Sequence, residues 1–179
     1  MSTAEIFGQI FGVIALAFCI AGFANRNDDR LMVLLISANV AFALMFACFQ
    51  SWTAAALTVL VIVRITLARR YPGNRVFLAV LLAVNLVVAW ATWKSVTDIF
   101  PLTAAVLGTF GMFMLRGIPL RIVLGLAALS WMLNNIVIGS LGGTLAEGMV
   151  LVTNIITIIR LYRLRKKYPD LQGDAIVRR

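Results

Sequence analysis

Long apolar runs alternate with short polar breaks along the whole chain. A membrane-spanning helix takes about 20 apolar residues. Seven runs approach that length, namely 4–23, 31–49, 52–70, 76–93, 98–115, 119–138 and 144–163. Charged or turn-forming residues separate them, as in Tyr71-Pro72-Gly73-Asn74-Arg75 and in the break from Gly139 to Gly143. The pattern predicts an all-α integral membrane protein with seven transmembrane helices.

The composition excludes an ordinary soluble domain. The 179 residues are 62% hydrophobic and 13% charged, whereas soluble domains are about 25% charged. The mean hydropathy is +0.99, and seven spans leave no room for a soluble catalytic domain. Because the chain contains no His and only two Cys, we expect no enzyme activity, no metal site and no cofactor.

The charge distribution predicts the orientation. If seven helices alternate in direction, 15 of the 16 Lys and Arg residues gather at one end of the bundle, and only Lys94 lies at the other. The positive-inside rule then puts this basic end in the cytoplasm, with the N-terminus outside and the C-terminus inside. Such a face attracts the anionic lipids of the bilayer. In this membrane setting we expect no nucleic-acid partner, and the sequence leaves an oligomer open.

Two three-helix units are expected, because the runs 52–70 and 144–163 look alike. At an offset of 96 residues, Thr58 pairs with Asn154 and Arg64 with Arg160. We interpret this as a parallel 3+1+3 repeat around a linker helix; the alternative is that apolar helices with basic ends simply look similar. The expected parts are the first unit 1–75, the linker helix 76–97, the second unit 98–168 and a cytoplasmic tail 169–179.

Polar residues inside the spans carry the functional prediction. An unpaired polar group is costly in hydrocarbon, so it faces the bundle interior and either joins helices or lines a solute path. The expected solute-binding residues gather in the sixth and seventh spans: Trp131, Asn134, Asn135, Asn154 and Thr157. An aromatic plane beside amide groups suits a small polar solute, and it equally suits interhelical packing.

Charged residues inside the spans add three candidates. Glu147 is the acidic residue clearly within a span. A carboxylate in hydrocarbon takes up a proton or needs a cation or hydrogen bonds beside it. Glu147 is therefore a proton-coupling or gate candidate, or else a carboxylate at the outer water interface. Arg64 and Arg160 either snorkel to the cytoplasmic lipid interface or face a cytoplasmic cavity that admits anions.

Several short motifs support a family resemblance. They are Trp131 to Asn135 (WMLNN), Gly139 to Thr144 (GSLGGT), Glu147-Gly148, Asn154 to Arg160 (NIITIIR) and Asn25 to Arg30. With these motifs the chain resembles the YgjV family of bacterial inner membrane proteins. The resemblance implies a multi-pass protein of the bacterial inner membrane and no established activity.

A looser resemblance extends to the SWEET, PQ-loop and KDEL-receptor group, through the 3+1+3 plan and the external N-terminus. In the transporters of that group asparagine and tryptophan line a central pocket, which Trp131, Asn135 and Asn154 match in kind. The chain departs from the group because its first and fifth spans lack a Pro-Gln pair.

We therefore expect a carrier or facilitator of an unknown small polar solute. The alternative is a non-transporting membrane receptor, sensor or assembly factor whose polar residues only join helices. A carrier predicts a water-filled cavity that reaches Trp131, Asn134, Asn135 and Asn154.

Overall fold

The computed structural model describes residues 2–24 and 28–167, apart from the side chains of 23, 28, 29, 31, 165 and 167. These residues form seven α-helices and one short 3-10 helix: α1 Thr3–Ala24, α2 Asp28–Cys48, α3 Trp52–Arg70, α4 Arg75–Thr92, η1 Val96–Asp98, α5 Ile99–Met114, α6 Gly117–Val137 and α7 Leu141–Lys167. The predicted tail 169–179 lies outside the described residues. For the part that is described, the all-α prediction is confirmed.

Most of the helices match the requirements of a membrane span. Six have the length and apolar composition needed to cross a bilayer. Within α2 the described apolar segment Met32–Cys48 is shorter than these six, and the helix begins with Asp28, Asp29 and Arg30. Asp98 stands at the start of α5, where its carboxylate accepts hydrogen bonds from the backbone amides of Lys94 and Ser95 at 2.8 and 2.9 Å.

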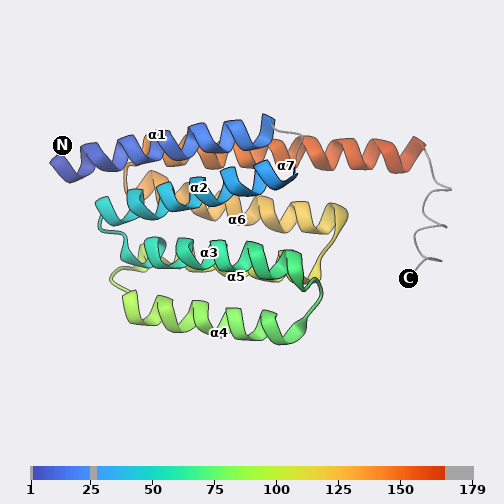
Figure 1. The fold of residues 1–179 in the computed structure, drawn as a ribbon, viewed down its shortest axis with the longest axis horizontal. Helices are drawn as coiled ribbons and strands as arrows, with labels where there is room; N and C mark the ends of the chain where they lie inside the picture. Colours follow the sequence, from blue (N-terminus) through green and yellow to red (C-terminus); the bar gives the residue numbers. More distant parts are fainter. Residues whose placement is uncertain (1, 25–27, 168–179) are drawn as a thin grey trace.

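Consecutive helices run antiparallel and form two triplets (Figure 1). The first triplet is α1, α2 and α3, packed in that order, and the second is α5, α6 and α7. The triplets meet where α1 contacts α7 and where α3 contacts α5. Helix α4 packs against α3 and α5 at one edge of the bundle, opposite α1 and α7.

The turn that joins α2 to α3 has the same geometry as the turn that joins α6 to α7. Gln50 has a φ of 56° in the first turn, and Gly139 has a φ of 76° in the second. The amide of Ser51 donates to the carbonyl five residues earlier at 2.9 Å, and the amide of Ser140 does the same at 2.9 Å. A separation of 89 residues (139 − 50) also relates the bounds of α2 to those of α6.

The break predicted at 139–143 is shorter than expected, because α7 begins at Leu141. Its first glycines serve helix packing and not a turn. A Cβ at Gly142 would collide with the backbone of Gly12 in α1, so only glycine permits this approach. The side chain of Gln9 in α1 holds the same turn. Its Nε2 donates to the Gly139 carbonyl at 2.7 Å, and its Oε1 accepts from the Leu141 amide at 3.1 Å.

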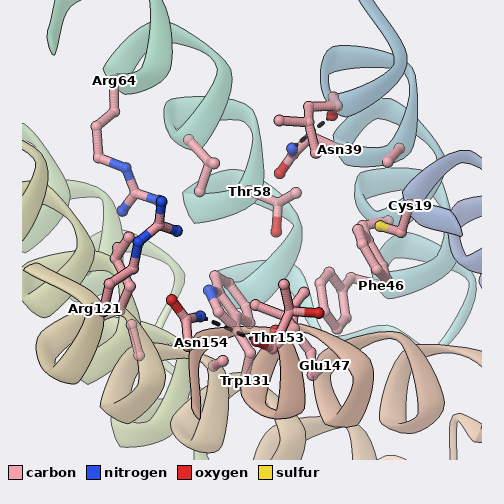
Figure 2. Close-up of a pocket in the computed structure, with 18 residues that line it drawn as sticks. Cys19, Asn39, Phe46, Thr58, Arg64, Arg121, Trp131, Glu147, Thr153 and Asn154 are labelled. Atoms are coloured by element: carbon pink, nitrogen blue, oxygen red, sulfur yellow. Dashed lines mark hydrogen bonds between the residues drawn. The ribbon is translucent and has the colours of Figure 1, made fainter. Parts of the chain in front are cut away.

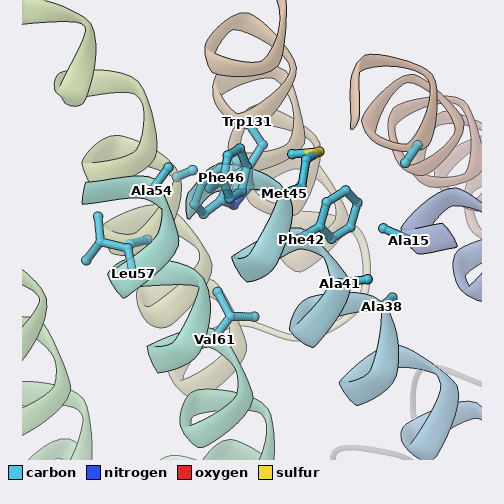
Figure 3. Close-up of a cluster of buried hydrophobic side chains, with 14 of the residues drawn as sticks. Ala15, Ala38, Ala41, Phe42, Met45, Phe46, Ala54, Leu57, Val61 and Trp131 are labelled. Carbon is cyan, nitrogen blue, oxygen red and sulfur yellow. The ribbon is translucent and has the colours of Figure 1, made fainter. Parts of the chain in front are cut away.

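The main apolar core lies where α1, α2, α3 and α6 meet (Figure 3). The ring of Phe46 stacks on that of Trp131, with 5.5 Å between centroids, and on that of Phe42, with 6.3 Å. Met45 and Leu57 of the same cluster are fully buried. Small residues let the helices approach here: Ala15, Ala38, Ala41 and Ala54. The aromatic stack also forms one wall of the cavity described next.

Candidate functional site

A cavity of about 260 Å³ lies between the two triplets, lined by α1, α2, α3, α6 and α7 (Figure 2). Its volume is close to the lower end of ligand pockets, about 300–1,000 Å³. Phe42, Phe46 and Trp131 supply an aromatic wall. The polar residues of the lining are Asn39, Thr58, Arg64, Arg121, Glu147, Thr153 and Asn154.

Each uncharged polar residue of the lining donates one side-chain hydrogen to its own helix. Each donates to the backbone carbonyl four residues earlier: Asn39 at 2.8 Å, Thr58 at 2.7 Å, Thr153 at 2.8 Å and Asn154 at 3.0 Å. Their side-chain oxygens are left as acceptors, and Asn154 Oδ1 has no hydrogen-bond partner among the described residues. This part of the cavity therefore offers acceptors to a solute.

Arg64 of α3 brings a cation into the protein interior. Only 8% of its surface is exposed. Its Nη1 donates to the Ala105 carbonyl at 3.3 Å, while its Nε has no partner within the part of the chain that is described. Space for the guanidinium comes from Gly108 of α5, where a Cβ would collide with Nη1. The backbone of α5 thus supports the arginine without neutralising it.

Arg121 of α6 is half-buried and lines the same cavity. In Figure 2 the guanidinium groups of Arg64 and Arg121 lie on one side of the cavity, close to Asn154. Glu147 lies on the other side, with Phe46 and Cys19. The two arginines and the carboxyl group of Glu147 therefore lie on opposite sides of the cavity.

A second hollow, of about 410 Å³, continues the cavity between α2, α3, α5 and α6. Leu35, Arg121 and Leu124 line both spaces, so the two adjoin. Arg69 and Arg116, near the ends of α3 and α5, line the second hollow. The cavity is thus continued toward the basic end of the bundle.

Toward the opposite end the interior is packed. Met45, Asn135 and Ser140 have at most 1% of their surface exposed. The Ser140 hydroxyl donates to Met45 Sδ at 3.0 Å and accepts from the Gly143 amide at 3.1 Å. These contacts close the cavity on the side of the α2–α3 and α6–α7 turns.

The structure brings part of the predicted site together. Trp131 and Asn154 line the cavity, and so do Glu147 and Arg64. Asn134 and Asn135 are 2% and 0% exposed and are not among its lining residues. The side-chain amide of Asn135 donates to the Trp131 carbonyl at 3.0 Å.

The remaining two predicted residues lie farther along α7, outside the cavity lining. Thr157 Oγ1 donates to the Thr153 carbonyl at 2.8 Å, and Arg160 is exposed near the basic end. The exposure of Arg160 agrees with the snorkelling alternative. Arg64, by contrast, faces the cavity.

Four of the seven polar lining residues named above were absent from the predicted site: Asn39, Thr58, Thr153 and Arg121. Helical spacing carries the signal that would have found Arg121. The positions 121, 124, 128 and 131 fall on one face of α6. Extending the face of Trp131 toward the start of the helix therefore reaches an arginine.

The comparisons with known proteins agree with this architecture. Residues 6–165 match the Imp-YgjV family, described as bacterial inner membrane protein. The chain is 27% identical to Inner membrane protein YgjV of Escherichia coli (strain K12) over 168 residues, which cover 94% of this chain and 91% of the relative. No solved structure matches the chain, so the looser SWEET-like resemblance stays a prediction. Since the family match extends over all seven helices, the chain belongs to the YgjV family of multi-pass bacterial inner membrane proteins.

Proposed function

We propose that this inner membrane protein is a carrier or facilitator for a small polar solute. One observation carries the proposal: a cavity lined by charged and uncharged polar side chains from both triplets. Polar groups within a membrane protein are costly and mark solute paths when they face an internal cavity. The proposed role is transport without catalysis, and it assigns solute contacts to Trp131 and Asn154 together with Asn39 and Thr58.

We infer that the two triplets are a parallel 3+1+3 repeat with α4 as the linker. The two matching turns support this, because they lie 89 residues apart in the sequence and so define the register between the triplets. It relates the cavity-lining positions of α2 to those of α6 as Leu35 with Leu124, Ala38 with Ala127, and Phe42 with Trp131. It likewise relates the positions of α3 to those of α7 as Thr58 with Glu147, Val61 with Val150, and Arg64 with Thr153.

This register differs from the predicted offset of 96 by seven residues, about two helical turns. The matching turns favour the shorter one. Helix contacts support the repeat at either offset, because relating α1 to α5 and α3 to α7 makes the α1–α7 contact equivalent to the α3–α5 contact, and both are present. Helix α4 lies outside the pattern, as a linker does.

With the basic end in the cytoplasm, the cavity is open toward the inside and closed toward the outside. The closing layer is the Phe46–Trp131 stack and the packed Asn134, Asn135 and Ser140 beyond it. A transport cycle then requires this layer to part. Glu147, on the far side of the cavity from the arginines, is the proton-linked or outer-gate group of the proposal.

Thermal unfolding of the purified protein tests the proposal, because a bound solute stabilises the folded state by mass action. Sugars, amino acids, vitamins and inorganic ions are the probes. Ala128→Leu extends a buried side chain into the cavity, while Ala91→Leu makes the same change on exposed α4. A solute should stabilise the wild type and Ala91→Leu, and it should enter proteoliposomes that contain either. Ala128→Leu should lose both responses.

Tryptophan fluorescence gives a second readout. Trp131 lines the cavity, whereas Trp52, Trp90 and Trp93 are at least 42% exposed. A solute that enters the cavity should change the fluorescence of the wild type and not that of Trp131→Phe. If no class of solute changes stability, fluorescence or uptake, transport is refuted, and the receptor, sensor or assembly-factor alternative gains support.

A further inference from the structure

We propose that the solute is a small organic anion whose oxyanion group binds Arg64 and Arg121 and whose remaining part donates hydrogen bonds. This inference rests on the transport function proposed above and names its substrate class. Three features carry it: an incompletely bonded buried guanidinium, a second arginine on the same side, and a set of acceptor oxygens beside them.

Arg64 is the first feature. A buried charge is stable only when it is paired or fully hydrogen-bonded. A guanidinium has five N–H donors, yet this one donates to a single backbone carbonyl, and its Nε is left without a partner among the described residues. No carboxylate of the described residues is hydrogen-bonded to it. The planar donor fork fits two oxygens of a carboxylate or phosphate, so an oxyanion supplies the missing partner.

Arg121 is the second feature. The lining holds two arginines and one carboxylate, so it has an excess of one positive charge. Two cations that line one cavity repel each other, and an anion between them removes that cost. The adjoining hollow adds Arg69 and Arg116 to its walls. A cleft lined by one sign of charge concentrates ions of the opposite sign, which favours entry of the anion from the basic end.

The acceptor oxygens are the third feature. Asn39, Thr58 and Asn154 each donate one side-chain hydrogen within their own helix, and their oxygens can receive O–H or N–H groups from a solute. Each asparagine amide keeps a second N–H donor. This set suits a hydroxy acid, an amino acid or a phosphate ester of a polyol. It suits neither a neutral sugar, which leaves both arginines unpaired, nor a hydrocarbon acid, which leaves the acceptors unpaired.

The test measures binding of matched probes to the purified full chain by thermal shift and by Trp131 fluorescence. The probes with an oxyanion group are glycerate, the zwitterion serine, glycerol 3-phosphate and inorganic phosphate; glycerol and glucose are the neutral controls, and propionate is the hydrocarbon acid. We expect at least one of the hydroxylated or aminated oxyanion probes to bind more tightly than glycerol, glucose and propionate. Comparing glycerate with glycerol 3-phosphate tells a carboxylate site from a phosphate site.

Substitution of the arginines identifies the site. Arg64→Gln should weaken binding of the anion about 10- to 100-fold, the range expected for hydrogen bonds to a charged group. Arg160→Gln removes an exposed arginine outside the cavity and should leave affinity unchanged. Arg64→Lys keeps the charge without the fork, so its affinity should fall between those of the wild type and Arg64→Gln. If Arg64→Gln does not fold, Arg64→Lys and Arg121→Gln still decide the matter.

The outcomes separate this inference from the transport proposal. Binding and uptake of a neutral solute, unaffected by Arg64→Gln, would overturn the anion inference and leave the carrier intact. No response to any probe class would overturn both. Stabilisation by phosphatidylglycerol in nanodiscs that Arg64→Gln abolishes, without a response to soluble anions, would assign the arginines to a lipid headgroup and overturn the inference.

Discussion

The guanidinium of Arg64 packs directly against the backbone of Gly108, which has no side chain to exclude it. The guanidinium of Arg64 reaches from α3 to α5 and lies against Gly108, at a point where any Cβ would collide with it. Ala105, one turn earlier in α5, accepts a hydrogen bond from Nη1 at 3.3 Å. The position of the buried cation is therefore set by the absence of a side chain on the neighbouring helix.

Gly108→Ala should displace the guanidinium without unfolding the protein. The new methyl meets the far end of a flexible side chain, and alanine gains about 1 kcal/mol of helix propensity over glycine. We expect the free energy of unfolding to change by no more than about 1 kcal/mol, while affinity for the anion falls. Thermal unfolding and the fluorescence titration measure the two effects.

Gly125→Ala is the matched control. Its Cβ would lie 3.7 Å from Leu151 Cδ1, an ordinary contact, so stability should hold or rise and binding should not change. If Gly108→Ala and Gly125→Ala bind the anion with equal affinity, Arg64 is not part of the binding site.

Gly142→Ala should be far more damaging. Here the Cβ would collide with the backbone of Gly12, which cannot rotate away, so α1 and α7 must separate. Overpacking of this kind costs about 1–3 kcal/mol, and we expect a loss near the upper end. Gly148→Ala, whose nearest neighbour is Met132 Sδ at 4.0 Å, should be tolerated. An unchanged unfolding temperature for Gly142→Ala would contradict the close α1–α7 packing.

Sequence reasoning recovered the helices because bilayer thickness sets the length of a span and charge marks its ends. It also singled out Trp131, Asn154 and Glu147, which line the cavity, because polar groups in an apolar run must face the interior. It could not tell these from Asn134 and Asn135. A side-chain amide in hydrocarbon is stabilised equally by a hydrogen bond to a helix and by a hydrogen bond to a solute. Only the packing around the amide shows which of the two bonds it can make.

The register of the proposed repeat was hidden for a different reason. Gln50 and Gly139 occupy the same left-handed turn position, yet their residue types differ, so the equivalence is visible in φ and in hydrogen bonds and not in sequence. Arg121 was missed because it lies near a polar break. An arginine there is as compatible with the lipid interface as with a cavity.

Ser140 and Ser51 offer a test of how far the two turns diverge. The Ser140 hydroxyl accepts from the Gly143 amide at 3.1 Å, whereas the Ser51 side chain makes no capping hydrogen bond. Loss of a capping side chain costs about 1 kcal/mol. Ser140→Ala should therefore lower the free energy of unfolding by about that amount, and Ser51→Ala should leave it nearly unchanged. Equal effects in thermal unfolding would contradict the difference between the turns.

The orientation of the bundle is open to direct measurement. Arg75 and Val96 are both exposed; Arg75 begins α4, and Val96 begins η1, just beyond the other end of α4. We expect Val96→Cys to face the periplasm and Arg75→Cys the cytoplasm, in a background where Cys19 and Cys48 are replaced by alanine. A membrane-impermeant maleimide should then label Val96→Cys in spheroplasts and Arg75→Cys only after lysis. The reverse pattern would turn the arginine-lined hollow toward the periplasm, so the cavity of this conformation would load its solute from outside the cell.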